Sequence, residues 1–113
     1  MIKKGEIWIA SLDTKKGVEV GKQRPVLIVQ SDFLNEVGHS TVVVLPITSQ
    51  PQEENVLRFK IVKNFLNKKI GFVLVDQLRA LDVQYRLKKS IGKVSDSEMS
   101  QIDLLIKQVL DLG

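Results

Sequence analysis

The sequence predicts a small, strongly curved antiparallel sheet or partial barrel, mainly β with one C-terminal helix, and so an α+β fold. Three observations support this fold class. Short apolar segments recur along the chain, close turns separate them, and one long amphipathic pattern follows at the C-terminal end. A length of 113 residues suffices for one modest core, so we expect a single domain over residues 1–113.

Two strands are predicted near the N-terminus, on either side of a polar loop. Residues 6–12 are apolar and β-rich and alternate roughly, which favours a strand. Residues 13–23 are polar and punctuated by glycine, as expected for a loop. Residues 24–30 are apolar on both faces, so they predict a strand in the centre of the sheet.

A helical turn and a third strand follow. Ser31 stands where an N-cap residue would start a single helical turn over residues 31–36. Residues 41–48 predict a strand, because β-branched and apolar residues fill the segment. Proline lacks a backbone N–H, so Pro46 favours a sheet edge or a bulge near the end of this strand.

The second half of the chain carries shorter β signals. Residues 57–61 alternate cleanly and predict a half-exposed strand, whereas residues 62–69 fit either a short helix or a turn. Residues 72–75 predict another buried strand. Residues 86–93 are basic with apolar residues interleaved, and we expect a short strand there.

The clearest local signal lies at the start of the C-terminal helix. Ser95 and Glu98 have the spacing of a capping box, and Val94 and Met99 have that of a hydrophobic staple. The helix should end near Gly113 and pack on the sheet. Its apolar stripe consists of Met99, Ile102, Leu105, Ile106, Val109 and Leu110.

Composition limits the classes of function. A net charge of +4 and a pI near 9.4 favour an anionic partner. The chain has no cysteine, which excludes disulfides, thiolate chemistry and zinc-finger sites. It has a single histidine, His39, and no carboxylate cluster with ligand spacing, so we expect no metal and no cofactor.

No segment is long and apolar enough to cross a bilayer, and the N-terminus lacks the apolar stretch of a signal peptide. The sequence therefore favours a cytoplasmic protein without a membrane partner.

Polar side chains at two strand ends are candidates for chemistry. Arg24 joins the polar loop to the strand that begins at Pro25, and its planar guanidinium suits a phosphate group. Thr48 and Ser49 stand where the third strand leaves the sheet, and their hydroxyls can donate to a phosphate oxygen. Taken singly, Arg24 also fits an ordinary surface ion pair, and the two hydroxyls fit a turn.

A third candidate segment directly follows the buried strand at 72–75. Asp76, Gln77 and Arg79 break its apolar pattern together, which suggests a position on a rim. The alternative is a structural ion pair between Arg79 and either Asp76 or Asp82.

These segments, taken together and in order, carry a resemblance. The chain resembles MazF/PemK-type toxins, the ribonuclease half of bacterial toxin–antitoxin pairs, and the resemblance covers almost its whole length. The motifs that match are Gly5-Glu6-Ile7-Trp8, Gly17-Val18-Glu19, Arg24-Pro25-Val26, Pro46-Ile47-Thr48-Ser49, Asp76-Gln77-Leu78-Arg79 and Ile91-Gly92-Lys93-Val94-Ser95.

The resemblance implies a small SH3-like barrel with an added sheet and a C-terminal helix, the CcdB/PemK type of fold. It implies a homodimer that cuts single-stranded mRNA at short sequence motifs without metal, leaving 2′,3′-cyclic phosphate and 5′-hydroxyl ends. It also implies a cognate antitoxin whose disordered acidic tail occupies the basic groove. By position, Arg24 and Thr48 match the catalytic pair, and Glu19 matches an acidic residue proposed as the base.

RNA binding requires a positive groove and surfaces on which bases stack. Trp8 and Phe33 are candidates for stacking, although a tryptophan inside a strand is more often part of the core. The residues that we expect to contact substrate are Lys16, Lys22, Ser49, Asp76, Gln77 and Arg79.

The chain departs from the family pattern at Val18 and Val20, which flank Glu19, and at Leu74, where some members carry arginine. Roles of the family residues at these positions therefore do not transfer. Two alternative functions stay open: a CcdB-like gyrase inhibitor, and a catalytically silent SH3-like module that binds RNA.

Overall fold

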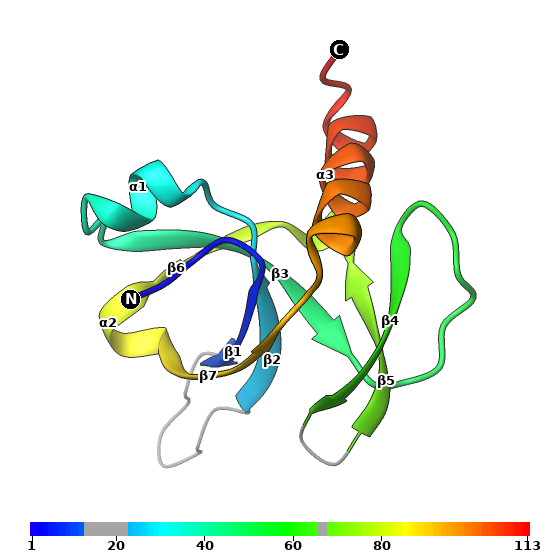
Figure 1. Cartoon of the computed structure of the whole chain (residues 1–113), viewed down its shortest axis with the longest axis horizontal. Coiled ribbons are helices and arrows are strands. Elements are labelled where there is room, and N and C mark those ends of the chain that lie inside the picture. Colours follow the sequence, from blue (N-terminus) through cyan, green and yellow to red (C-terminus); the bar gives the residue numbers. More distant parts are fainter. Residues whose placement is uncertain (13–22, 66–67) are drawn as a thin grey trace.

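The computed structural model describes residues 1–12, 23–65 and 68–113. Figure 1 shows a curved sheet with α3 between the α1 side of the molecule and the β4–β5 hairpin. The elements in chain order are β1 (Glu6–Ser11), β2 (Gln23–Ile28), α1 (Asp32–Glu36), β3 (Thr41–Thr48), β4 (Arg58–Phe65), β5 (Lys68–Leu74), the 3-10 turn η1 (Val75–Gln77), β6 (Arg79–Asp82), α2 (Val83–Arg86), β7 (Leu87–Lys93) and α3 (Asp96–Leu110).

The described strands form one antiparallel sheet in the order β4-β5-β3-β2-β1-β7, and β6 pairs separately with β3. β2 lies between β1 and β3, which confirms the prediction of a central strand. Because β4 and β7 are the two ends of this order, the described sheet is curved but open.

β3 changes its neighbour along its length. Its first part, residues 41–44, pairs with β6, and its last two residues, Ile47 and Thr48, pair with β5. Pro46 therefore lies where neither of these two strands is paired with β3, so its missing N–H costs no ladder hydrogen bond on that side. The expectation of a sheet edge at Pro46 is wrong, because β3 is central and Pro46 itself is buried and opposite Val26 of β2.

Alternation along the strands divides the core into two clusters. Leu27 belongs to a cluster beneath α3, whereas its neighbours Val26 and Ile28 belong to a second cluster on the other face of the sheet. β3 divides in the same way, with Val44 in the second cluster and Leu45 in the first. Two buried faces explain why these strands read as continuous apolar runs.

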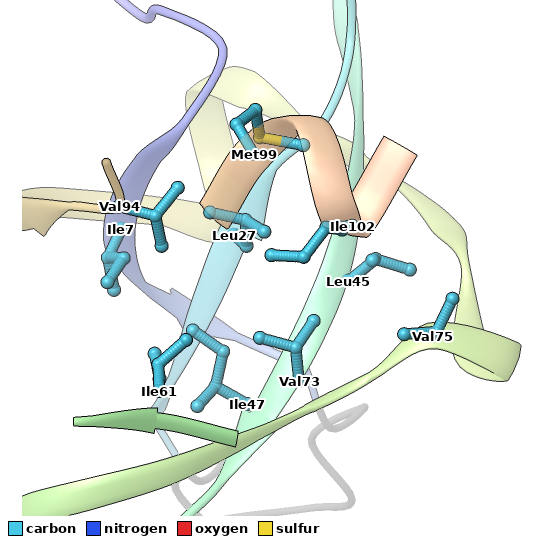
Figure 2. Close-up of a cluster of buried hydrophobic side chains, with 10 residues drawn as sticks. All are labelled: Ile7, Leu27, Leu45, Ile47, Ile61, Val73, Val75, Val94, Met99 and Ile102. Atoms are coloured by element: carbon cyan, nitrogen blue, oxygen red, sulfur yellow. The ribbon is translucent and has the colours of Figure 1, made fainter. Parts of the chain in front are cut away.

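α3 begins with the predicted capping box. The backbone N–H of Glu98 donates to Ser95 Oγ at 3.0 Å, and Glu98 Oε1 accepts from the Ser95 backbone N–H at 2.8 Å. Figure 2 shows Ile102 of α3 pointing toward the strand residues of the first cluster, to which Met99 also belongs. Leu110, the last residue of the predicted stripe, is 48% exposed, because the helix has passed the edge of the core there.

The other local predictions have mixed outcomes. α1 forms as a short helix, and Ser31 Oγ accepts from the Leu34 backbone N–H at 3.4 Å. Residues 62–65 belong to β4 and residues 68–69 to β5, so the helix alternative is wrong for the described part of the segment 62–69. β7 confirms the short strand near 86–93, where it pairs with β1. β6 and α2 were not expected.

Candidate active site

A cavity of about 520 Å³ lies where β3 changes its neighbour. The residues around it come from the ends of β1, β2, β3 and β5 and from the segment that follows β5. Its described lining combines apolar with polar side chains: Leu12, Arg24, Pro46, Ile47, Thr48, Leu74, Gln77 and Arg79.

Arg24 is the second residue of β2 and an exposed lining residue of this cavity. Strand pairing sets it opposite Ala10 of β1, and Pro25 follows opposite Ile9. Within residues 1–12, 23–65 and 68–113, no acidic side chain forms an ion pair with Arg24. Its positive charge therefore faces the cavity without a described counter-ion.

Thr48 is the last residue of β3 and lines the same cavity. Its Oγ1 accepts a hydrogen bond from the Gln50 backbone N–H at 3.2 Å. Since the backbone uses the oxygen only as an acceptor, this contact leaves the hydroxyl proton available as a donor. A guanidinium and a hydroxyl from separate strand ends thus share one cavity.

The segment 76–79 contributes two of its three candidate residues to the lining. Gln77 and Arg79 line the cavity, and one Nη of Arg79 donates to the backbone carbonyl of Leu12 at 3.3 Å. Asp76 instead forms an ion pair with Arg58, with Nη1 2.7 Å from Oδ1.

The ion pair considered from sequence between Arg79 and Asp76 or Asp82 is not the one that forms. Asp82 Oδ1 accepts from the Tyr85 backbone N–H at 2.8 Å and caps α2. Asp76 lies within reach of Arg58 because β4 and β5 pair.

Other candidates lie elsewhere. Ser49 is exposed beyond the end of β3 and is not a lining residue. Glu19, Lys16 and Lys22 lie outside the described residues, as do Val18 and Val20. The cavity therefore holds four of the six candidates that the structure describes: Arg24, Thr48, Gln77 and Arg79.

Neither aromatic candidate lines the cavity. Trp8 packs against the second core cluster, and its indole Nε1–H donates to Glu6 Oε1 at 3.1 Å. Phe33 is 73% exposed on α1. The described lining contains no aromatic ring on which a base could stack.

Four residues of this region were missed by sequence reasoning. Leu12, Pro46 and Ile47 contribute apolar surface to the lining, and Arg58 holds Asp76. Leu12 and Pro46 border the candidate strand ends and could have been found by position. Arg58 carries no local signal, because its role arises from the pairing of β4 with β5.

The chemistry of the site follows from its charges. Two arginines line it, and none of its described lining residues is acidic. Arginine and hydroxyl donors are the groups that bind phosphate oxygens. No group of His, Asp or Glu side chains in the described part of the chain could hold a metal ion. The described helices also include none with the length and apolar character to cross a bilayer.

Fold and cavity together define a class of protein: a small curved sheet with a cavity, lined by two arginines, at the ends of its central strands. Residues 3–110 match the family model of PemK-like, MazF-like toxins of type II toxin–antitoxin systems. The chain belongs to this family.

Relatives agree with this assignment. Endoribonuclease MazF9 of Mycobacterium tuberculosis is 32% identical over 122 residues, which cover 99% of this chain and 98% of that protein. The solved structure of the M. tuberculosis toxin MazF-mt6 has a TM-score of 0.77 at 27% identity, over 96% of this chain and 98% of that one.

A crystal structure of MazE–MazF from Deinococcus radiodurans has a TM-score of 0.79 over 99% of this chain and 97% of that one. At 17% identity it supports the fold alone. The predicted curved antiparallel sheet with a C-terminal helix is thus confirmed.

Proposed function

We propose that this protein is a sequence-selective endoribonuclease toxin that cleaves single-stranded mRNA without a metal and is neutralised by a cognate antitoxin. The observation that carries the proposal is that Arg24 and Thr48, from separate strand ends, line one cavity. Family membership and the name of the M. tuberculosis relative, an endoribonuclease, support it.

The reaction is an in-line transesterification. The 2′-oxygen of the ribose attacks the adjacent phosphorus, and the bond from phosphorus to the 5′-oxygen breaks, leaving a 2′,3′-cyclic phosphate and a 5′-hydroxyl. Negative charge builds on the equatorial phosphate oxygens, where the Arg24 guanidinium and the Thr48 hydroxyl would donate. Preorganised donors of this kind supply several kcal/mol of transition-state stabilisation.

A base must accept the proton of the 2′-hydroxyl. By resemblance to the family, this role falls to Glu19, which lies outside the described residues. Arg24 is better suited to stabilise charge than to protonate the leaving oxygen, because a guanidinium is a weak proton donor.

Selectivity for a sequence would come from the other polar lining residues. The Gln77 amide offers both donors and an acceptor to the edge of a base, and Arg79 offers a plane for stacking and donors for phosphate. Leu74 stands in the lining where some family members carry arginine, so it adds apolar contact rather than charge.

The antitoxin would use the same cavity. A cognate antitoxin is bound in a solved structure of a mycobacterial endoribonuclease that shares this fold. An acidic, disordered segment complements a cavity lined by two arginines, and it would compete directly with RNA. We further propose that the active form is a homodimer, as the family resemblance implies.

Incubation with a long single-stranded RNA in the presence of EDTA tests the activity, and mapping of the cut ends gives the products and the sequence preference. Arg24→Ala and Thr48→Val should each lower kcat by about 100-fold or more while the protein stays folded, because each removes a transition-state donor. Lys107→Ala, which removes an exposed charge on α3, is the matched control and should cut at the wild-type rate.

The outcomes separate the proposal from its alternatives. Wild-type rates in Arg24→Ala would remove Arg24 from the mechanism. RNA affinity without any product would indicate a silent RNA-binding module. Trapped gyrase complexes without RNA cleavage would indicate a CcdB-like inhibitor.

A further inference from the structure

Arg58 is a junction between two segments that border the cavity, although it is not itself a lining residue. It is the first residue of β4. Its Nη1 donates to Asp76 Oδ1 at 2.7 Å and to the Leu57 backbone carbonyl at 2.8 Å, and its Nε donates to Gln52 Oε1 at 3.3 Å. The Arg58 side chain is 22% exposed and that of Asp76 is 36% exposed, so the pair is partly shielded from water.

One arm of this junction leads to Thr48. The Gln50 backbone N–H donates to Thr48 Oγ1 at 3.2 Å, and Gln52 Nε2 donates to the Gln50 backbone carbonyl at 3.4 Å. Because Gln52 Oε1 accepts from Arg58 Nε, three hydrogen bonds, through the Gln50 backbone and the Gln52 side chain, link the candidate catalytic hydroxyl to the Arg58 guanidinium.

The other arm leads to η1, which carries Gln77 into the cavity lining. This turn has no side-chain cap at its N-terminus. Two polar contacts with the start of β4 hold it: the Val75 backbone N–H donates to the Leu57 carbonyl at 3.0 Å, and Asp76 pairs with Arg58. Such short turns have few hydrogen bonds of their own and depend on tertiary contacts for their geometry.

We propose that Arg58 is a positioning residue that fixes the distance between Thr48 and Gln77 across the cavity. It does so by bonding to Gln52, which is linked to Thr48, and to Asp76, the neighbour of Gln77. The inference rests on the proposed ribonuclease function. A planar guanidinium suits the role because its fork of donors reaches Asp76 and Gln52 at once, which an ammonium group cannot reproduce. Loss of the junction should misplace the donors around the scissile phosphate rather than weaken the attraction of RNA.

The variants to compare are Arg58→Met, which keeps the aliphatic stem, and Asp76→Asn, which removes the charge of the partner. Each should lower kcat for single-stranded RNA about tenfold or more, because small displacements of catalytic groups are costly. KM should change less than about twofold, and the double variant should lose little more than either single variant, as expected for two halves of one contact.

A control ion pair of similar exposure joins the segment before β1 to α3, and neither of its residues lines the cavity. Lys4 Nζ is 2.9 Å from Asp103 Oδ2, and these side chains are 32% and 38% exposed. Lys4→Met should leave kcat unchanged. Amide hydrogen exchange of residues 74–78 gives a readout without RNA: it should rise in Arg58→Met and Asp76→Asn, but not in Lys4→Met.

Direct binding of RNA by Arg58 is the rival role, and it has a different signature. Arg58→Met would then raise KM and reduce the salt dependence of binding, whereas Asp76→Asn would lower KM because it releases the guanidinium. That pattern, or a wild-type kcat in Arg58→Met, overturns the proposal. Absence of cleavage by the wild-type protein would instead overturn the proposed function itself, and this role with it.

Discussion

At the scale of single residues, backbone geometry holds Arg24 at the cavity. Pairing of β1 with β2 fixes Arg24 opposite Ala10, and the buried part of the strand starts at Val26, after the half-buried Pro25. Two other arginines secure the end of β1: Arg79 donates to the Leu12 carbonyl and Arg86 to the Ser11 carbonyl, each at 3.3 Å. These two hydrogen bonds therefore hold the end of β1, the strand that pairs with β2 at Arg24, in place beside the cavity.

Asp32 gives a pH-dependent prediction at the same scale. The Lys4 backbone N–H donates to Asp32 Oδ1 at 2.7 Å, and this hydrogen bond lowers the pKa of the carboxyl, with smaller help from Asn35 and the positive charge of Lys3. A lowered pKa in the folded state means that the carboxylate stabilises the fold fully above the unfolded pKa, about 3.9. This contribution is lost as the pH falls through the folded pKa.

Asp32→Ala should therefore lower the free energy of unfolding near pH 7, and the difference from the wild type should shrink as the pH falls below about 4. Urea unfolding at several pH values measures it. Glu54→Ala removes an exposed carboxylate from the segment between β3 and β4 and serves as the control. A difference for Asp32→Ala that persists unchanged at pH 2 would contradict the assignment.

Sequence predicted the residues at strand ends better than it predicted their partners. Arg24, Thr48, Gln77 and Arg79 were recognisable because each polar side chain adjoins a strand with buried residues, and they do line one cavity. The Arg58–Asp76 pair was not predicted, because it depends on the pairing of β4 with β5 and no local pattern encodes that register. Whether the lining residues act in catalysis stays a prediction.

At the scale of elements, α3 is the helix that local signals define most fully. Ser95→Ala removes the hydroxyl that accepts from the Glu98 backbone N–H, so it should cost about 1 kcal/mol of stability. Chemical denaturation measures this loss. Ser100→Ala, at an exposed position within the same helix, is the control and should change stability by less than about 0.5 kcal/mol.

An equal loss in the two serine variants would contradict the capping role of Ser95, because Ser→Ala inside a helix raises helix propensity and should not itself destabilise. Local signals also explain which elements could be predicted from the sequence. Caps and apolar periodicity are local, so α3 and α1 could be predicted from sequence. β6 and α2 were missed, since a four-residue strand and a four-residue helix carry too little pattern to stand out.

At the scale of the whole molecule, α3 and the sheet are joined through the first core cluster. Ile102 is 0% exposed and points from α3 toward the strand residues of that cluster (Figure 2). Ile102→Ala should cost about 2–5 kcal/mol, because it removes buried methyl groups and leaves a cavity. A domain of this size has about 5–15 kcal/mol in total, so the variant should unfold at a much lower urea concentration.

Leu104→Ala on the exposed side of α3, where Leu104 is 57% exposed, is the matched control and should change stability little. A small effect of Ile102→Ala would mean that α3 is not needed to close the core.

Fold class could be predicted from the sequence because it depends on counts and periods of strands. Strand order could not, since β1 pairs with β7 across most of the chain. The change of neighbour at Pro46 likewise depends on distant segments.

The change of neighbour along β3 has a consequence for how such a protein can diversify. Thr48 and Arg24 are anchored in paired strands, whereas Gln77 belongs to a connection that merely crosses the gap between β5 and β6. In the proposed ribonuclease, substitutions of Gln77 itself would change which nucleotides are admitted, whereas substitutions of its neighbour Asp76 would also disturb Thr48 through Arg58. We therefore expect that evolution can vary Gln77 freely, while Asp76 beside it is constrained by its contact with Arg58.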